Sequence, residues 1–168
     1  MRRSFILLVV MAFALAAGAQ TGLKKVYNDD INPMEQIDQA IAKAKKEGKF
    51  VICQVGGNWC PWCLRFADLI SKDEVIGDII SKNYEYIHVS YNPRRSSNKA
   101  KAEQSAALMK RLNNCARFGF PVFVVLNEEG KVIHIQDSYY LEKKGTESYD
   151  KEMVLRFFKN WTPQTVKR

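Results

Sequence analysis

An α/β fold is predicted for this 168-residue chain by two observations. Short runs rich in β-branched and aromatic residues alternate along the chain with segments whose apolar residues recur at helical spacing. Two of the strand-like runs near the end of the chain are separated only by a short glycine-containing turn, which indicates a β-hairpin. About 150 residues remain once a predicted leader is set aside, which is the size of one domain.

The leader begins with Arg2 and Arg3, continues as an apolar run over residues 5–17, and ends in the small residues Ala17-Gly18-Ala19. This order predicts a secretory signal peptide over residues 1–19. The apolar run is shorter than the roughly 20 residues that a bilayer core requires, which favours cleavage over an uncleaved anchor.

Cleavage would leave a single domain over residues 20–168, secreted across the inner membrane and expected in the periplasm. No second long apolar stretch follows, so we expect no stable membrane insertion of the mature protein. The formal charge is +8, but the basic residues are scattered, which is typical of a solvated surface. We therefore expect no nucleic-acid partner.

In the first half, residues 24–31 are predicted to form a short strand or an extended arm. Asn32 and Pro33 then begin a helix that ends at Gly48. The apolar run Phe50–Val55 is predicted to be a buried central strand, and glycines end it before the cysteines.

A helix is predicted to follow the cysteines directly, and three more helices and three strands are predicted after it. Beyond that helix, the predicted segments are a helix at 73–82, a strand at 84–90, a polar surface excursion at 94–104, a helix at 106–112, a hairpin with strands at 122–126 and 131–135, and a closing helix at 150–161. The predicted order is β-α-β-α-α-β-α-β-β-α.

Cys60 and Cys63 form a tight C-x-x-C pair at the point where a strand leads into a helix, whereas Cys53 and Cys115 stand alone. Disulfide exchange needs an attacking thiolate and a second thiol close enough to release the mixed disulfide. A cysteine at a helix N-terminus is favoured as a thiolate, because unpaired N–H groups and the helix dipole stabilise its charge. Pro61 fits the first helical turn without losing a hydrogen bond.

The sequence Trp59-Cys60-x-x-Cys63, followed by Gly119-Phe120-Pro121 before a hairpin, resembles the thioredoxin superfamily. The run Ala42–Lys49, which leads straight into the strand before the cysteines, is similar to that of the exported thioredoxin-like branch. The resemblance implies a three-layer α/β/α fold with a mixed sheet of four to five strands. It also implies an exposed nucleophile Cys60, a resolving Cys63, and a cis-proline at Pro121 whose neighbouring backbone receives the substrate chain.

Two positions depart from the superfamily pattern. Gln54 stands where thioredoxins usually carry a buried aspartate that helps proton transfer from the second thiol, and Gln cannot ionise. Pro61 and Trp62 replace the Gly-Pro dipeptide of typical thioredoxins, so a reductase-like direction does not follow from the resemblance.

The expected activity is thiol–disulfide exchange with exported protein substrates, supporting redox homeostasis of the compartment, with a separate redox partner that resets the cysteine pair. No cofactor is expected beyond the Cys60–Cys63 disulfide. Trp59, Trp62 and Phe120 are expected to form an apolar docking collar around the reactive thiol, beside Pro121.

The cysteine pair has three other interpretations. A structural zinc site would need two further ligands, normally another closely spaced pair, and the remaining cysteines and histidines are scattered singly. A c-type haem site would need a histidine where Leu64 follows Cys63. A thioredoxin-fold peptide-binding module without turnover remains the alternative, although such modules normally lose one or both cysteines.

Each of four single residues can be interpreted as structural or as functional. Cys53 is expected to be a small buried apolar residue, and Cys115 a free thiol in preference to part of a second or regulatory disulfide. His88 is expected at the surface of its strand in preference to tuning the cysteines, and His134 on the hairpin surface.

Overall fold

The computed structural model describes residues 22–92 and 98–167, so the predicted signal peptide lies outside the described residues. One mixed sheet has the strand order β2-β1-β3-β4. Strand β1 (Phe50–Gly56) pairs in parallel with β2 (Tyr84–Ser90) and antiparallel with β3 (Val122–Leu126), and β3 pairs antiparallel with β4 (Val132–Asp137). The two central strands are fully buried, as a sheet covered on both faces requires.

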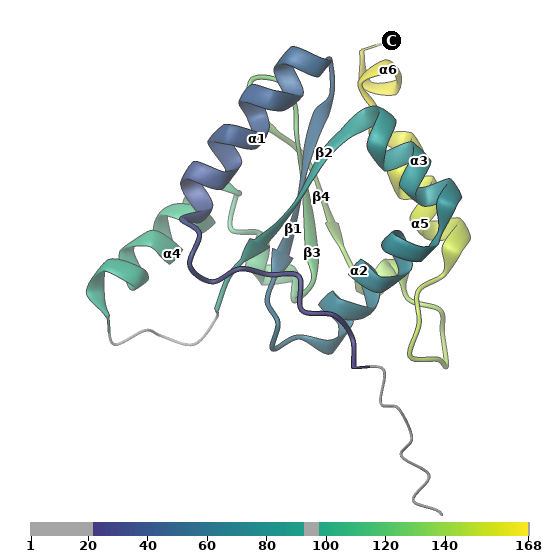
Figure 1. The fold of residues 1–168 in the computed structure, drawn as a ribbon, viewed down its shortest axis with the longest axis horizontal. Helices are drawn as coiled ribbons and strands as arrows, with labels where there is room; N and C mark the ends of the chain where they lie inside the picture. The colour runs from purple at the N-terminus through teal and green to yellow at the C-terminus, as the bar shows by residue number, and fades with distance from the viewer. Residues whose placement is uncertain (1–21, 93–97, 168) are drawn as a thin grey trace, which may run out of the picture.

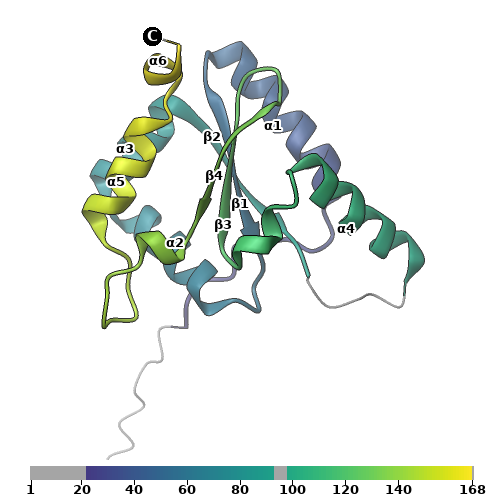
Figure 2. The same cartoon turned by 180° about the vertical axis from the view of Figure 1, so that it is seen from behind.

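Helices cover both faces of this sheet, as the two opposite views show (Figures 1 and 2). One face carries α1 (Pro33–Glu47) and α4 (Lys99–Arg111), and the other carries α2 (Pro61–Lys72), α3 (Glu74–Asn83) and α5 (Lys151–Asn160). Shorter turns are η1 (Cys115–Phe118), η2 (Tyr139–Leu141) and the terminal α6 (Pro163–Val166). The predicted three-layer α/β/α fold with a mixed sheet is confirmed, and the sheet has four strands.

Alternation along β1 divides the interior into two cores. Val51, Cys53 and Val55 pack into the cluster beneath α1 and α4. Phe50 and Ile52 point the other way, into the cluster beneath α2, α3 and α5. Gln54 has the same parity as Phe50 and Ile52, so the strand carries its polar side chain towards the helix of the cysteine pair.

The predicted helix boundaries hold where a cap defines them. The Asn32 side chain accepts a hydrogen bond from Met34 N–H at the start of α1, and Gly48 ends the helix in the left-handed conformation, with φ of 68°. In the same way, Asp73 caps α3 and Asp150 caps α5.

Residues 24–31 form an extended arm, which is the second of the two predicted alternatives. The arm does not pair with the sheet, and its Val26 and Tyr27 backbone N–H groups both donate to the Asn58 side chain. One prediction about the chain path was wrong. Helix α4 begins at Lys99, not near Ala106. Its first turns are rich in Ala, Lys, Glu and Gln, which favour helix without an apolar face, and Asn98 caps them.

Within residues 22–92 and 98–167, none of the helices has the length and apolar character needed to cross a membrane.

Candidate active site

The cysteine pair lies at the N-terminus of α2, directly after the short loop that connects β1 to this helix. Cys60 is the N-cap residue in an extended conformation, and its sulfur accepts a hydrogen bond from the Cys63 backbone N–H at 3.2 Å. The sulfurs of Cys60 and Cys63 are joined in a disulfide, with the two Cα atoms 5.3 Å apart. Pro61 occupies the first helical position, where its missing N–H has no helical acceptor. Negative charge on Cys60 would therefore sit at the positive end of the helix dipole.

Access to the two sulfurs is restricted in this oxidised form. Cys60 is only 5% exposed and Cys63 is completely buried. The expectation of an exposed first cysteine was therefore too simple, because Tyr27 and Leu64 pack against the pair in one small cluster. Cys60 therefore differs from Cys63 in accessibility only by this small exposed fraction.

Glycine at position 56 is what allows β1 to pass this close to the disulfide. A Cβ atom there would overlap the Cys63 sulfur and would lie 3.0 Å from the Tyr27 hydroxyl oxygen. The Tyr27 hydroxyl oxygen and the Cys63 sulfur are therefore both close to the same point at the end of β1. The Gly56 backbone oxygen accepts from Tyr91 N–H at 2.7 Å, which fixes the end of the strand.

A hydrogen-bonded network of neutral side chains lies beneath the pair. The Gln54 amide nitrogen donates to the Tyr27 hydroxyl at 2.7 Å and to the Cys63 backbone oxygen at 2.9 Å. The Tyr86 hydroxyl donates to the Gln54 side-chain oxygen at 2.6 Å. Burial raises the pKa of Tyr27 and of Tyr86 above the ordinary tyrosine value, so both hydroxyls stay protonated. Gln54 thus holds the helix N-terminus through hydrogen bonds and not through charge.

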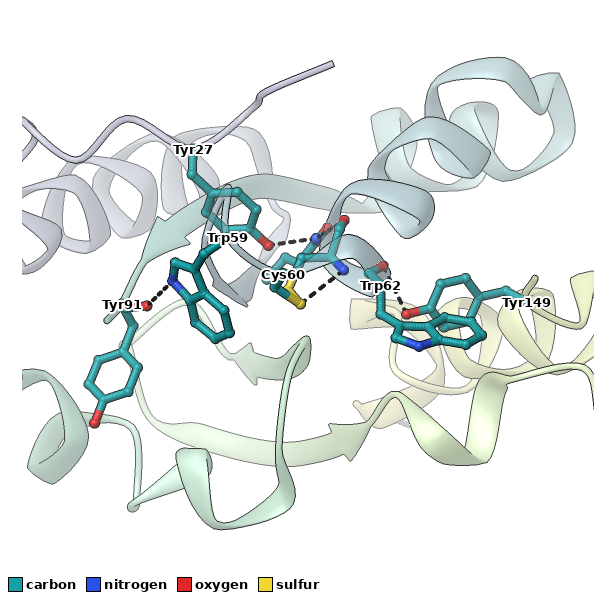
Figure 3. The surroundings of a disulfide bond; sticks show 8 residues. Tyr27, Trp59, Cys60, Trp62, Tyr91 and Tyr149 are labelled. Carbon is teal, nitrogen blue, oxygen red and sulfur yellow. Dashed lines mark hydrogen bonds between the residues drawn. A yellow bond between two sulfur atoms is a disulfide. The ribbon is translucent and has the colours of Figure 1, made fainter. Parts of the chain in front are cut away.

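Aromatic side chains flank Cys60 on two opposite sides (Figure 3). On one side the Trp59 indole is 48% exposed, donates its N–H to the Tyr91 backbone oxygen, and meets the Phe120 ring edge-on at 5.3 Å. On the other side the Trp62 ring meets the Tyr149 ring edge-on at 5.3 Å, and the Tyr149 hydroxyl donates to the Trp62 backbone oxygen.

The three residues predicted as a docking collar therefore belong to two separate aromatic contacts. Trp59 and Phe120 contact each other, whereas Trp62 packs against Tyr149. The Arg65 guanidinium carbon lies over the Trp62 ring, 5.1 Å from the centre of that ring. Trp59 alone is broadly exposed among the three.

The loop before β3 reaches the same end of the sheet. The Phe120–Pro121 peptide bond is cis, and Pro121 is buried at the start of β3. The Phe120 ring stacks on the Tyr91 ring with centroids 5.6 Å apart, so Trp59, Tyr91 and Phe120 form one continuous aromatic surface beside Cys60.

The other two cysteines are free thiols buried in the opposite core. Burial raises the pKa of the Cys53 thiol, and the nearby Cys115 thiol raises it further. Burial also raises the pKa of Cys115, to about 11. Neither thiol is ionised at neutral pH, and both behave as small apolar residues.

The two histidines are less exposed than the sequence suggested. His88 is half-buried, with its Nε2 atom unpaired and its ring edge-on to Tyr27 and Tyr86. Burial lowers the pKa of His88 to about 4, so its ring is neutral at pH 7. His134 stacks on the Trp161 ring with centroids 4.0 Å apart. Among the described residues, no three His, Cys, Asp or Glu side chains gather as a metal-binding group.

Sequence reasoning did not identify Tyr27, Asn58, Tyr86 or Tyr149 as neighbours of the cysteine pair. Tyr86 could have been found, because it lies on the same side of β2 as Gln54 does on β1. Tyr27 and Tyr149 lie in segments without periodic pattern, so no sequence signal placed them here.

With this geometry in place, comparison with known proteins assigns the family. The chain matches the thioredoxin-like domain family over residues 37–151 and belongs to it. This confirms the predicted membership of the thioredoxin superfamily. Among curated protein sequences, none matches the chain.

Two solved structures share the fold. A disulphide isomerase from Xylella fastidiosa Temecula1 is similar with a TM-score of 0.65 and 20% sequence identity, covering 82% of this chain and 97% of its own. A protein described as DsbH oxidoreductase is similar with a TM-score of 0.50 and 16% identity, covering 71% of this chain and 77% of its own. At these identities the likeness concerns the fold.

Proposed function

We propose that this thioredoxin-like protein is an exported thiol–disulfide oxidoreductase that acts on protein substrates through Cys60 and Cys63. The observation that carries the proposal is the position of the Cys60 sulfur, which caps α2 and is bonded to a second cysteine inside the first turn. A peptide-binding module needs neither sulfur, whereas exchange chemistry needs both.

Exchange then proceeds in two displacements. In the reducing direction the Cys60 thiolate attacks one sulfur of a substrate disulfide; a Cys60–substrate bond forms and the other substrate sulfur leaves as a thiolate. Cys63 loses its proton to solvent and attacks the Cys60 sulfur. The Cys60–Cys63 bond forms, and the second substrate sulfur leaves with the electron pair. Oxidation of a dithiol substrate is the same sequence reversed.

The aromatic surface of Trp59, Tyr91 and Phe120 supports docking of a polypeptide on one side of Cys60. A hollow beside Trp59 is lined by apolar groups of Ile31, Tyr91 and Leu108 and by polar side chains that include Lys101. Backbone next to the cis Phe120–Pro121 bond is the proposed place for the substrate chain. Trp62, on the other side of Cys60, completes the proposed contact surface.

Export is supported by the sequence of residues 1–19, which has the basic, apolar and small-residue order of a signal peptide. The proposed location is the periplasm, with exported proteins as substrates and a separate redox protein that resets the pair. A cofactor other than the disulfide is not part of the proposal. Mass spectrometry of protein recovered from the periplasm tests this, since the expected mature chain starts at Gln20.

Insulin reduction with a thiol donor, and refolding of a reduced disulfide protein, test the activity. The wild-type protein should accelerate at least one of them, and Cys60→Ser should accelerate neither. Trp59→Ala should raise KM for insulin while leaving the reaction with a small aromatic disulfide unchanged, because only the protein substrate uses the aromatic surface. Equal effects on the two substrates would contradict the docking role.

A further inference from the structure

The orientation of the Gln54 side chain is determined by its partners. The Cys63 backbone oxygen can only accept a hydrogen bond, so the group that faces it must be the amide nitrogen. The other amide atom is then the oxygen, which accepts from the Tyr86 hydroxyl. The amide nitrogen therefore also supplies the hydrogen in its 2.7 Å contact with the Tyr27 hydroxyl.

This arrangement leaves the hydrogen of the Tyr27 hydroxyl unused by Gln54. Among the described residues, the Tyr27 hydroxyl takes part in the hydrogen bond from Gln54 and in no other. The oxygen lies beside Gly56, on the side where a Cβ atom would overlap the Cys63 sulfur. The Cys63 sulfur is thus an acceptor close to this hydroxyl; in the oxidised form, where the sulfur is bonded to Cys60, no hydrogen bond joins the two.

Tyr27 is held at this position through its backbone. The Asn58 side chain accepts from the Val26 and Tyr27 N–H groups at 3.1 Å and donates to the Tyr27 backbone oxygen at 2.7 Å. Tyr27 is 6% exposed and packs in one cluster with Cys60 and Cys63. An arm that does not pair with the sheet is therefore anchored to the loop that precedes the cysteines.

We propose that the Tyr27 hydroxyl donates a hydrogen bond to the Cys63 sulfur whenever that sulfur is a thiolate, and so acts as a positioning residue for the resolving step. The proposal rests on the proposed function. In the reducing direction the bond stabilises the Cys63 thiolate before it attacks Cys60; in the oxidising direction it stabilises Cys63 as the leaving group. The Cys63 proton itself passes to solvent, because Tyr27 already accepts from Gln54 and stays a neutral donor.

The groups around Cys63 leave few other sources of pH dependence. Tyr27 on the arm, Tyr86 on β2 and Tyr149 after η2 have pKa values raised by burial and remain neutral. His88 on β2 has its pKa lowered to about 4 by burial, so it is neutral too. From about pH 6 to pH 9 the groups left to titrate beside Cys63 are the thiols themselves.

Rapid mixing of the reduced protein with an aromatic disulfide whose released thiolate is coloured separates the two displacements. Cys60 attack releases one equivalent, Cys63 attack releases the second, and Cys63→Ser should release only the first. Tyr27→Phe should move the pH midpoint of the second phase up by about one unit and slow that phase about threefold near pH 7, leaving the first phase unchanged, because about tenfold less thiolate is offset by a thiolate that is about threefold more nucleophilic. At alkaline pH, where both proteins are fully ionised, the variant should become the faster of the two.

Tyr84→Phe is the matched control. It removes another buried tyrosine hydroxyl on β2, which donates to the Phe158 backbone oxygen at 2.6 Å, and should leave both phases unchanged. As a second readout, thiolate absorbance in the Cys60→Ser background should show the Cys63 pKa raised by about one unit when Tyr27→Phe is added.

An unchanged second phase, or a slowing that is equal at every pH, would overturn the role of Tyr27. Failure of the wild-type protein both to release the second equivalent and to catalyse insulin reduction or refolding would overturn the proposed function, and the inference with it. The two failures are therefore distinguishable.

Discussion

Replacing Gln54 by glutamate tests the claim that a neutral network supports the cysteine pair. The two side chains have the same shape, so the change concerns hydrogens and charge. The glutamine nitrogen donates to both the Cys63 backbone oxygen and the Tyr27 hydroxyl. A protonated glutamic acid can donate once, and a carboxylate cannot donate at all. Gln54 is 0% exposed, so the carboxylate would also be fully buried. It would face the Cys63 backbone oxygen, to which the glutamine nitrogen now donates.

The magnitude follows from these contacts. The protonated form loses one donor and should be about 1 kcal/mol less stable than wild type. Burial and the facing carbonyl should raise the pKa of the glutamate by about two to three units, even though the Tyr86 hydroxyl can still donate to it. At about 1.4 kcal/mol per unit, ionisation costs a further ~3 to 4 kcal/mol. Because the folded-state pKa is raised, this cost is absent below about pH 4 and grows as pH rises through the folded-state pKa.

Urea unfolding of the disulfide-closed protein between about pH 4 and pH 8 measures this difference. Gln54→Glu should approach wild type at the acidic end and fall furthest below it at the alkaline end. Gln36→Glu is the matched control, since Gln36 is only half-buried and donates to the His88 backbone oxygen. It should show little pH dependence. A Gln54→Glu deficit that is constant with pH would refute the account of the buried network.

Two further predictions concern packing, one beside the Cys60–Cys63 pair and one in the opposite core. Gly56→Ala should lower the free energy of unfolding by about 1 to 3 kcal/mol, because the new methyl group overlaps the Cys63 sulfur. Gly77→Ala, in a helix with its nearest neighbouring atom 3.8 Å away, should be neutral or stabilising by chemical denaturation, and equal losses would contradict the steric explanation. Cys53 and Cys115 should resist alkylation in the folded protein at neutral pH, since burial raises the pKa of each thiol, and should react fully in denaturant. Rapid labelling of either thiol in the native state would contradict their place in the core.

Much of the fold was predictable because local signals agreed with tertiary structure. Asn32 and Gly48 define α1 through capping, and the turn before β4 is closed by the Asn127 side chain, which accepts from the Lys131 N–H. The sequence left residues 24–31 open between a strand and an extended arm, because the partner that holds them is the side chain of Asn58 and not a strand. Helix α4 began earlier than its apolar residues, since helix propensity and a cap sufficed.

The candidate site was predictable in its chemistry and less so in its surroundings. The spacing of Cys60 and Cys63 at a strand–helix junction indicated the disulfide that the structure contains. Trp62 packs edge-on against the buried ring of Tyr149 and not against Trp59. Tyr149 lies in a loop 87 residues further along the chain, so no local pattern indicates this contact. Gln54 was identified as a departure from the family, but its three hydrogen bonds depend on long-range contacts with Tyr27 and Tyr86 that no local pattern encodes.

Trapping of mixed disulfides tests the central claim most directly. Exchange through an attacking Cys60 and a resolving Cys63 predicts that Cys63→Ser, expressed with its native leader, accumulates covalent adducts with exported proteins that a reductant releases. Cys60→Ser should accumulate almost none, since Cys63 is completely buried. Equal trapping by the two variants, or adducts linked through Cys115, would contradict the assignment of Cys60 as the nucleophile.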